Sequence, residues 1–160
     1  MCFVDYRKAF DVVNRNFLWK ILKKNGIPED LIAAIQSLYE NNKIVVEITN
    51  SKYQSSEINN GVRQGCPLSP ALFNVFIDEI VEQWKLQLRY NFKMNNTNID
   101  TILFADDQVI IANSEDKLQY ATYKLNEIAY NYELEISITK TKVLAFKGDV
   151  TIRAKIVLKI

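Results

Sequence analysis

Histidine is absent from this 160-residue sequence, and cysteine is nearly so. Without histidine there can be no Ser-His or Cys-His nucleophile pair, no histidine general base and no histidine-containing zinc finger. The two cysteines, Cys2 and Cys66, are too few for a disulfide framework or a four-cysteine zinc site, which favours a reducing compartment. Any chemistry must therefore use carboxylates, lysine or metal ions.

Long apolar runs are also missing. No stretch approaches the ~20 apolar residues that a membrane-spanning helix needs, and the N-terminal segment carries Asp5 and lacks the apolar core of a signal peptide. We therefore expect an intracellular protein that is not secreted and has no membrane partner.

No excess of one charge dominates the chain. Lys and Arg number 20 against 19 Asp and Glu, a formal net charge of +1, so no overall basic field indicates a nucleic-acid partner. The distribution is nevertheless uneven: residues 1–24 hold six basic and two acidic side chains, residues 25–139 hold eight and 16, and residues 140–160 hold six and one. The acidic middle fits poorly with tight binding of a duplex by this piece alone, because phosphate neutralisation supplies most of such affinity.

Length and patterning predict one α+β domain with an antiparallel sheet. A 3.6-residue apolar period predicts helices near residues 14–25, 28–40, 70–88 and 114–132. Alternation and turn residues predict strands at 2–4, 44–48, 53–58, 101–104, 108–112, 134–138, 143–146 and 152–160. We expect six or so strands in one sheet, with the first, third and fourth helices on one face. Neither terminal strand has a turn beside it, so the chain is expected to be truncated at both ends.

Three carboxylates are the best candidates for chemistry. Asp5 ends the first strand, and Asp106 and Asp107 lie at the tip of the 101–112 hairpin. Adjacent like charges are unfavourable unless a cation lies between them, and carboxylate oxygens are ligands that Mg²⁺ prefers. If the first strand lies beside the hairpin, Asp5 and Asp106 can hold two metal ions about 3.5–4 Å apart, as in nucleotidyl transfer.

A polar turn is the alternative interpretation of Asp106-Asp107, because Asp is a favoured turn residue. The residues on either side argue against it. Phe104 before the tip and the apolar residues 109–111 after it are expected to bury the hairpin on both sides and so hold its tip in place.

Four segments resemble sequence motifs of one enzyme family. Residues 3–11 read Phe-Val-Asp-Tyr-Arg-Lys-Ala-Phe-Asp, residues 61–70 Gly-Val-Arg-Gln-Gly-Cys-Pro-Leu-Ser-Pro, residues 104–107 Phe-Ala-Asp-Asp and residues 140–142 Lys-Thr-Lys. In this order they resemble motifs A to D of reverse transcriptases, with wording closest to the non-LTR (long interspersed element type) retrotransposon branch. A group II intron or telomerase-type polymerase resembles this wording less.

The resemblance implies a polymerase palm with part of the fingers and no thumb, over residues 1–160. Asp5, Asp106 and Asp107 would be catalytic metal ligands for two Mg²⁺ ions, with Mn²⁺ able to substitute. Lys140 would supply a proton or a positive charge to the departing pyrophosphate. A surface turn lysine is the alternative for Lys140.

The resemblance also implies a substrate-binding set. Phe10 would lie under the incoming sugar and select deoxynucleotides by a clash with a 2′-hydroxyl, the alternative being an ordinary core aromatic. Gln64 and Gly65 would face the nucleotide and template, because Gly permits a close backbone approach and Gln offers both a donor and an acceptor. Arg63 would contact a phosphate or carboxylate, or else be a solvated loop charge.

Several further residues receive structural expectations. Asp11 is expected to support the local backbone or to pair with Arg15 or a nearby Lys. Ser69 and Pro70 are expected to cap and begin the long helix. Glu133 and Ser137 stand where the family commonly has Gly and Asn. Four tyrosines could stack bases or form a partly buried helix face: Tyr120, Tyr123, Tyr130 and Tyr132.

The resulting hypothesis is an RNA-directed DNA polymerase palm acting in retrotransposition. Its partners would be an RNA template, a DNA primer, deoxynucleoside triphosphates and the missing fingers and thumb segments of the parent polyprotein, with a nuclear location for that role. The alternative is a non-catalytic remnant or interaction module that retains the palm fold. A nuclease with the same two-metal chemistry also stays open.

Overall fold

The chain folds into two compact units, Met1–Ala9 with Ile77–Ile160 and Phe10–Phe76. The computed structural model of the protein describes residues 1–40, 43–48, 51–57, 59–88, 92–94, 96–146 and 158, with the backbone alone for 43–48, 51–57 and 94. None of the helices in these ranges is long and apolar enough to cross a membrane.

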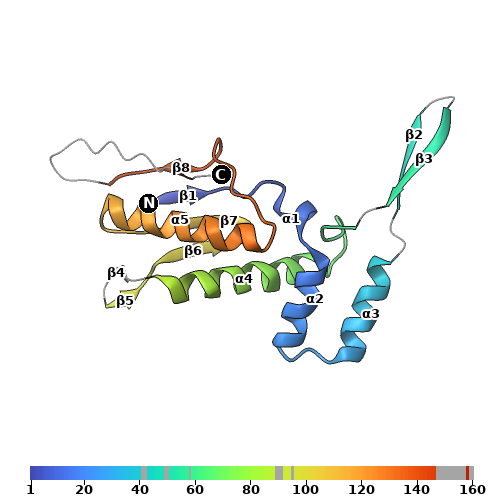
Figure 1. The fold of residues 1–160 in the computed structure, drawn as a ribbon, viewed down its shortest axis with the longest axis horizontal. Helices are drawn as coiled ribbons and strands as arrows, with labels where there is room; N and C mark the ends of the chain where they lie inside the picture. The colour runs from blue at the N-terminus through green and yellow to red at the C-terminus, as the bar shows by residue number, and fades with distance from the viewer. Residues whose placement is uncertain are drawn as a thin grey trace. The chain divides into compact units, whose positions relative to one another are not determined.

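The first unit is built on a four-stranded antiparallel sheet in the order β6-β7-β1-β8 (Figure 1). Its elements are β1 (Cys2–Val4), the later part of α4 (Ser69–Gln87), β4 (Lys93–Met94), β5 (Thr97–Asn98), β6 (Thr101–Phe104), β7 (Asp107–Ile110), α5 (Glu115–Asn131) and β8 (Lys142–Val143). Strand β1 therefore lies between the hairpin and the C-terminal strand, which joins the two ends of the described sequence in one sheet.

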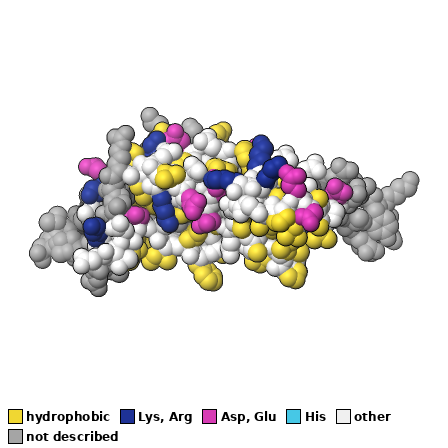
Figure 2. Space-filling model, turned by 90° about the horizontal axis from the view of Figure 1, so that it is seen from below, with side chains coloured by type: hydrophobic (Ala, Val, Ile, Leu, Met, Phe, Trp, Pro, Cys, Tyr) yellow, Lys and Arg dark blue, Asp and Glu magenta, His cyan; other side chains and the backbone are white. Residues whose placement is uncertain are grey.

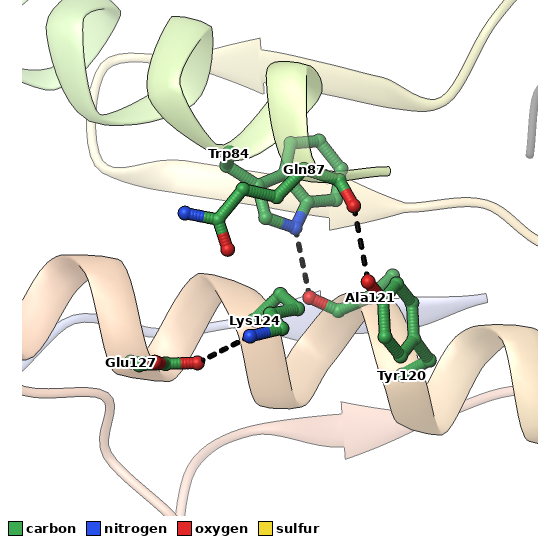
Figure 3. Close-up of polar contacts among 6 residues, drawn as sticks. All are labelled: Trp84, Gln87, Tyr120, Ala121, Lys124 and Glu127. Atoms are coloured by element: carbon green, nitrogen blue, oxygen red, sulfur yellow. Dashed lines mark hydrogen bonds and ion pairs between the residues drawn. The ribbon is translucent and has the colours of Figure 1, made fainter. Parts of the chain in front are cut away.

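Alternation along the strands gives the sheet one buried and one open face. Cys2 and Val4 are buried and Phe3 between them is exposed, and on β7 Gln108 and Ile110 are buried. The later part of α4 and α5 lie side by side against the buried face (Figures 1 and 3). Among the described residues of this unit, no helix covers the open face, in agreement with the prediction that the helices near 70–88 and 114–132 lie on one face (Figure 1).

Two hydrogen bonds join α4 to α5 (Figure 3). The indole Nε1 of Trp84, which is fully buried, donates to the Ala121 carbonyl at 2.8 Å, and the Tyr120 hydroxyl donates to the Gln87 carbonyl at 3.1 Å. A buried indole normally finds such an acceptor because an unpaired N–H is costly. The two helices are therefore held in a defined relation over the sheet.

The second unit begins with three helices and a hairpin: α1 (Ala9–Val12), α2 (Arg15–Lys24), α3 (Glu29–Tyr39), β2 (Lys43–Ile48) and β3 (Ser51–Glu57), followed by the first turns of α4. Asn14 caps α2 by accepting hydrogen bonds from the amides of Asn16 and Phe17. The turn after α2 places Gly26 at a φ of +78°, as the Asn-Gly stop signal predicts.

A loop of this unit folds back onto α1. The Gly61 amide donates to the Val13 carbonyl and the Val62 amide to the Phe10 carbonyl, both at 2.8 Å. Arg15 reinforces the loop, because its guanidinium donates to the Gly61 carbonyl at 2.9 Å. Motif B is thereby tied to the end of motif A and to the residues that follow it.

The predicted helices are confirmed, and several strand predictions need correction. Strands β2 and β3 pair with each other as a separate two-stranded sheet, so the larger sheet has four strands within the described ranges. Of the 134–138 strand only a single bridge forms, from Ile136 to Tyr6, because the amides of Lys140 and Thr141 turn back onto the Ser137 carbonyl. Strand 143–146 shortens to Val143 paired with Cys2.

Two further differences concern the Asn-rich loop at residues 91–98 and the C-terminal end of the chain. The loop at 91–98 contains the short pair β4–β5, which the sequence does not predict. The predicted strand 152–160 falls outside the described residues, apart from Leu158, which is in no strand.

Candidate active site

Asp5 directly follows β1 and is held in place through its backbone. Its amide donates to the Thr141 hydroxyl at 3.3 Å, and its carbonyl accepts from the Ser137 amide at 2.8 Å. The same 137–141 turn brings Lys140 Nζ to 3.6 Å from Asp5 Oδ1. Two sequence-predicted site residues from opposite ends of the chain, Asp5 and Lys140, therefore meet.

The environment of Asp5 favours a cation. Oδ1 is buried and has no hydrogen-bond partner among the described residues, although the carboxylate as a whole is 35% exposed. A buried carboxylate oxygen without a donor is costly, and a charged ligand removes that cost. The Lys140 side chain is largely exposed, so its ammonium has room to move aside for another cation.

Asp107 begins the strand that pairs with β1, and Asp106 precedes it in the hairpin turn. Cys2, Phe3 and Val4 face Ile110, Val109 and Gln108, and extending this register by one residue places Asp5 opposite Asp107. Asp107 is not part of the hairpin tip, because it pairs with Phe104 as the first residue of β7. The tip is therefore two residues, Ala105 and Asp106, with Ala105 at a φ of +53°, a conformation usual in tight hairpins but strained for alanine.

The structure does not by itself gather these carboxylates into a ligand cluster. Among the described residues, no three Asp, Glu, Cys or His side chains lie close enough together to hold a metal ion. Like-charged carboxylates repel one another when no cation lies between them. The assignment of Asp5, Asp106 and Asp107 as metal ligands stays a prediction, supported by the strand register and by the buried Asp5 Oδ1, which accepts no hydrogen bond from the described residues and lies 3.6 Å from the exposed Lys140 ammonium.

The expected burial of the hairpin on both sides is wrong. Phe104 is 82% exposed and Ile102 is 55% exposed, whereas Ile110 is fully buried. Alternation along the strand explains this exposure. Leu103 lies opposite Gln108 on the helix-covered face, so Ile102 and Phe104 on either side of it point to the open face. The hairpin is held from its helix side, and apolar side chains line the open face beside the carboxylates.

The motif B loop of the second unit exposes Arg63, Gln64 and Gly65. Gln64 Nε2 donates to Asp11 Oδ1 at 3.0 Å, a partner for Asp11 that the sequence analysis did not name. Arg63 donates to the Leu38 carbonyl at 3.0 Å near the end of α3, which gives its side chain a structural contact while leaving it exposed. Gly65 has a φ of +77°, in the region that favours glycine.

Phe10 and Ser69 take specific structural positions in the same unit. The half-buried ring of Phe10 stacks on Phe73, with centroids 4.1 Å apart and planes inclined by 21°. Ser69 begins α4, but its hydroxyl donates to the Arg63 carbonyl at 2.6 Å and so braces the motif B loop. Ser69 therefore begins the helix as predicted, but its hydroxyl donates to a loop carbonyl, whereas a cap would accept from a helix amide.

The four tyrosines of the 114–132 region do not form one stripe. Tyr120 and Tyr132 are half-buried, and their hydroxyls donate to the Gln87 carbonyl and to Glu79 Oε1. Tyr123 and Tyr130 are 43% and 74% exposed. Two of the four thus belong to the partly buried face of α5.

Sequence reasoning missed two polar side chains next to the carboxylates, Tyr6 and Gln108. Both are buried and hydrogen-bonded to each other. A glutamine inside an otherwise apolar strand is the signal that could have identified the pair, because a polar group is buried there only with a partner.

Charge is mixed over the surface drawn in Figure 2. On that face, Lys and Arg side chains of the described residues are scattered among Asp and Glu and do not gather into one basic strip. This agrees with the near-zero net charge of the chain.

The antiparallel sheet with helices on one face and acidic residues at the β1 end and the adjacent hairpin is a palm-type polymerase fold. Among solved structures, a telomerase of Candida tropicalis, in complex with the TWJ fragment of telomeric RNA, resembles it with a TM-score of 0.68 at 18% identity, covering 88% of this chain and 25% of that one. This likeness confirms the predicted α+β palm.

Sequence comparison shows which family carries this fold here. Residues 1–153 match the family described as reverse transcriptase (RNA-dependent DNA polymerase), and the chain belongs to that family. It is 31% identical over 142 residues to the Pol polyprotein of type-1 retrotransposable element R2 of Nasonia vitripennis, and 28% identical over 148 residues to that of type-2 element R2DM of Drosophila melanogaster. The prediction of a non-LTR retrotransposon reverse transcriptase domain is confirmed.

The chain is short compared with these relatives. The matches cover 89% and 91% of this chain but 14% of each polyprotein. Residues 1–153, which match the reverse transcriptase family, include all four motif segments.

Proposed function

We propose that this chain is the palm of an RNA-directed DNA polymerase that adds deoxynucleotides to a primer 3′-hydroxyl along an RNA template. The observation that supports the proposal is the β1–β7 register, whose extension by one residue would set Asp5 opposite Asp107 and beside the Asp106 turn, in a member of the reverse transcriptase family. Fingers and thumb segments of a parent polyprotein would supply the remaining grip on the substrates, because the middle of this chain is acidic.

Asp5, Asp106 and Asp107 are the residues proposed to hold two divalent ions, Mg²⁺ or Mn²⁺. Such ions lower the pKa of the attacking hydroxyl and neutralise charge on the triphosphate and departing pyrophosphate. The chain's own contribution is to hold the carboxylates. The 137–141 turn fixes the Asp5 backbone, and the hairpin fixes that of Asp106 and Asp107.

Lys140 is proposed to serve the same centre. Its ammonium lies 3.6 Å from Asp5 Oδ1 and is largely exposed, so it can turn toward a bound triphosphate. There it would offer positive charge, or a proton, to the leaving pyrophosphate.

The second unit is proposed to bind the nucleotide and template through Phe10, Arg63, Gln64 and Gly65. The stacking of Phe10 on Phe73 gives its ring a fixed orientation, which a steric test of the 2′-position requires. The bond from Gln64 to Asp11 likewise restricts the Gln64 amide while leaving the loop exposed.

Primer extension on an RNA template with Mg²⁺ tests the proposal, by comparison of the wild-type chain with Asp106→Asn. We expect extension by the wild type and a loss of at least about a hundredfold in the variant, because metal-ion charge stabilisation is worth several kcal/mol. Asp78→Asn, a matched change on the exposed surface of α4, should leave extension unchanged.

Two outcomes contradict the polymerase proposal. Absence of extension by the wild type, alone and with fingers and thumb segments restored, would indicate a non-catalytic remnant or interaction module. A shortened primer would indicate a nuclease.

A further inference from the structure

Two buried polar side chains lie directly behind the carboxylates. Tyr6 follows Asp5 and is 3% exposed, and Gln108 follows Asp107 and is 1% exposed. Because successive residues of a strand point to opposite faces, both lie on the helix-covered face while their acidic neighbours lie on the open one. The polar pair and the acidic pair thus sit back to back across the sheet.

A chain of hydrogen bonds links these residues across three strands. The Tyr6 hydroxyl donates to Gln108 Oε1 at 2.5 Å, and Gln108 Nε2 donates to the Thr101 hydroxyl at 3.1 Å. Thr101 in turn donates to the Val109 carbonyl at 2.9 Å. Burial raises the pKa of Tyr6 well above its ordinary value, so its hydroxyl keeps the donated proton throughout the neutral range.

Apolar patterning alone does not select one register for β1 against β7. A slip by two residues would still turn Cys2, Val4 and Ile110 toward the helices, because the side-chain period of a strand is two. The slip that sets Asp5 opposite Ala105 would set Tyr6 opposite Phe104, which separates Tyr6 from Gln108 and leaves a buried donor and a buried acceptor unpaired, a strongly unfavourable result. The opposite slip would set Tyr6 directly opposite Gln108 and keep the two side chains within reach. The polar pair therefore penalises one of the two slips that the apolar residues tolerate.

The register also decides which residue faces Asp5. Extended by one residue, the observed pairing sets Asp5 opposite Asp107, and after the two slips Asp5 would fall opposite Ala105 or Val109. We propose that Tyr6 and Gln108 are positioning residues, whose hydrogen bond opposes the slip toward Ala105 and so holds Asp5 in the register that sets it opposite Asp107. The register role rests on the geometry of the sheet. Its importance for metal binding rests on the proposed function.

The test compares Tyr6→Phe, Gln108→Leu and the double variant in the full chain. Each single change leaves one buried group unpaired and should lower the melting temperature by about 4–10 °C. The double variant removes both groups, so it should melt closer to the wild type than either single variant. The double variant should therefore stay folded, so that the register can be measured in the absence of the Tyr6–Gln108 hydrogen bond.

Two measurements separate positioning from mere stability. Backbone NOEs between Phe3 and Val109 report the native register, and NOEs from Phe3 to Ile111 or to Asp107 report the two slips. Broadening of the Asp5 and Asp107 amide signals during a Mn²⁺ titration reports the affinity of the carboxylates. The matched control is Tyr39→Phe in the second unit, which removes a buried hydroxyl that lies 3.4 Å from the Ser69 hydroxyl.

We expect the double variant to show the Phe3–Asp107 NOEs of the slip that the pair opposes, and about tenfold weaker Mn²⁺ binding, a loss typical of residues that orient ligands. Tyr39→Phe should keep both wild-type readouts. A double variant with native NOEs and wild-type Mn²⁺ affinity would overturn the inference. If the wild type itself binds no Mn²⁺ at these aspartates, the proposed metal chemistry fails, and the NOEs alone then support or overturn the register role.

Discussion

At the scale of single residues, Gly61 shows how backbone geometry constrains the motif B loop. Its φ is +81°, and a Cβ built there would lie 2.6 Å from the Asp11 carbonyl oxygen. Gly26 has a similar φ of +78° but nothing within 4 Å of the same position. A side chain at either glycine would strain the backbone, but only at Gly61 would it also clash, with the Asp11 backbone.

We predict that Gly61→Ala destabilises the protein far more than Gly26→Ala. The change at Gly26 should lower the free energy of unfolding by about 1–2 kcal/mol, the cost of a left-handed conformation for alanine. The change at Gly61 should cost about 3 kcal/mol or more, because the loop must also move from α1. Urea denaturation of both variants measures the difference, and equal losses would contradict the clash.

Residue identity also limited what could be predicted about the site. Asp5, Asp106, Gln64 and Lys140 were identifiable because motif wording marks them one by one. The bond between Gln64 and Asp11 was not, since nothing in a linear sequence says which of several nearby charges a glutamine contacts. Contacts between residues far apart in the chain depend on how the backbone closes.

At the scale of elements, the end of α5 carries an unusual residue. The Leu134 amide donates to the Ala129 carbonyl and the Glu133 amide to the Tyr130 carbonyl, a Schellman motif. Its left-handed position is Glu133, with a φ of +61°, where the family commonly has Gly. Glutamate in place of glycine therefore preserves the hydrogen bonds of the turn but strains the backbone at residue 133.

We predict that Glu133→Gly stabilises the protein by about 0.5–1 kcal/mol. Relief of the left-handed strain, about 1–2 kcal/mol, exceeds the added chain entropy of glycine in the unfolded state, about 0.4–1 kcal/mol. Glu133→Ala, which removes the carboxylate but retains a Cβ, should give no such gain. Urea denaturation of both variants checks this, and equal effects would assign the change to charge.

Helices were predicted more accurately than strands, and the reason is physical. The bounds of α2 and α5 follow from local features, such as the Asn14 and Ser114 caps and an apolar period of 3.6. Strands depend on partners elsewhere in the chain. Residues 134–138 alternate like a strand, yet only Ile136 finds a pairing position beside β1.

At the scale of the whole molecule, buried ionisable groups make stability depend on alkaline pH. Burial raises the pKa of both the Cys2 thiol and the Tyr6 hydroxyl, so the folded protein keeps these protons longer than the unfolded chain does. Unfolded Cys and Tyr ionise near pH values of about 8.5 and 10. Above each of these values the unfolded state binds fewer protons, and the free energy of unfolding falls as pH rises.

We therefore predict a lower free energy of unfolding at pH 10.5 than at pH 7.5, with each group contributing up to about 1.4 kcal/mol per pH unit above its unfolded pKa. Urea denaturation across this range measures the slope. Cys2→Ala should flatten the slope from about pH 8.5 and Tyr6→Phe from about pH 10. A slope unchanged in both variants would show that other groups control alkaline unfolding.

The linear sequence by itself determined the order of the four motifs, the helices and the positions of the acidic residues, because periodicity, capping and motif wording are local properties. From these the α+β palm and the reverse transcriptase family could be predicted. Only the tertiary structure decided that Phe104 faces outward, that Lys140 reaches Asp5 and that Tyr6 bonds Gln108. The orientation of Phe104 depends on the pairing within its own hairpin. The other two contacts join segments more than a hundred residues apart in the chain, and apolar alternation leaves the register of such segments open to slips of two.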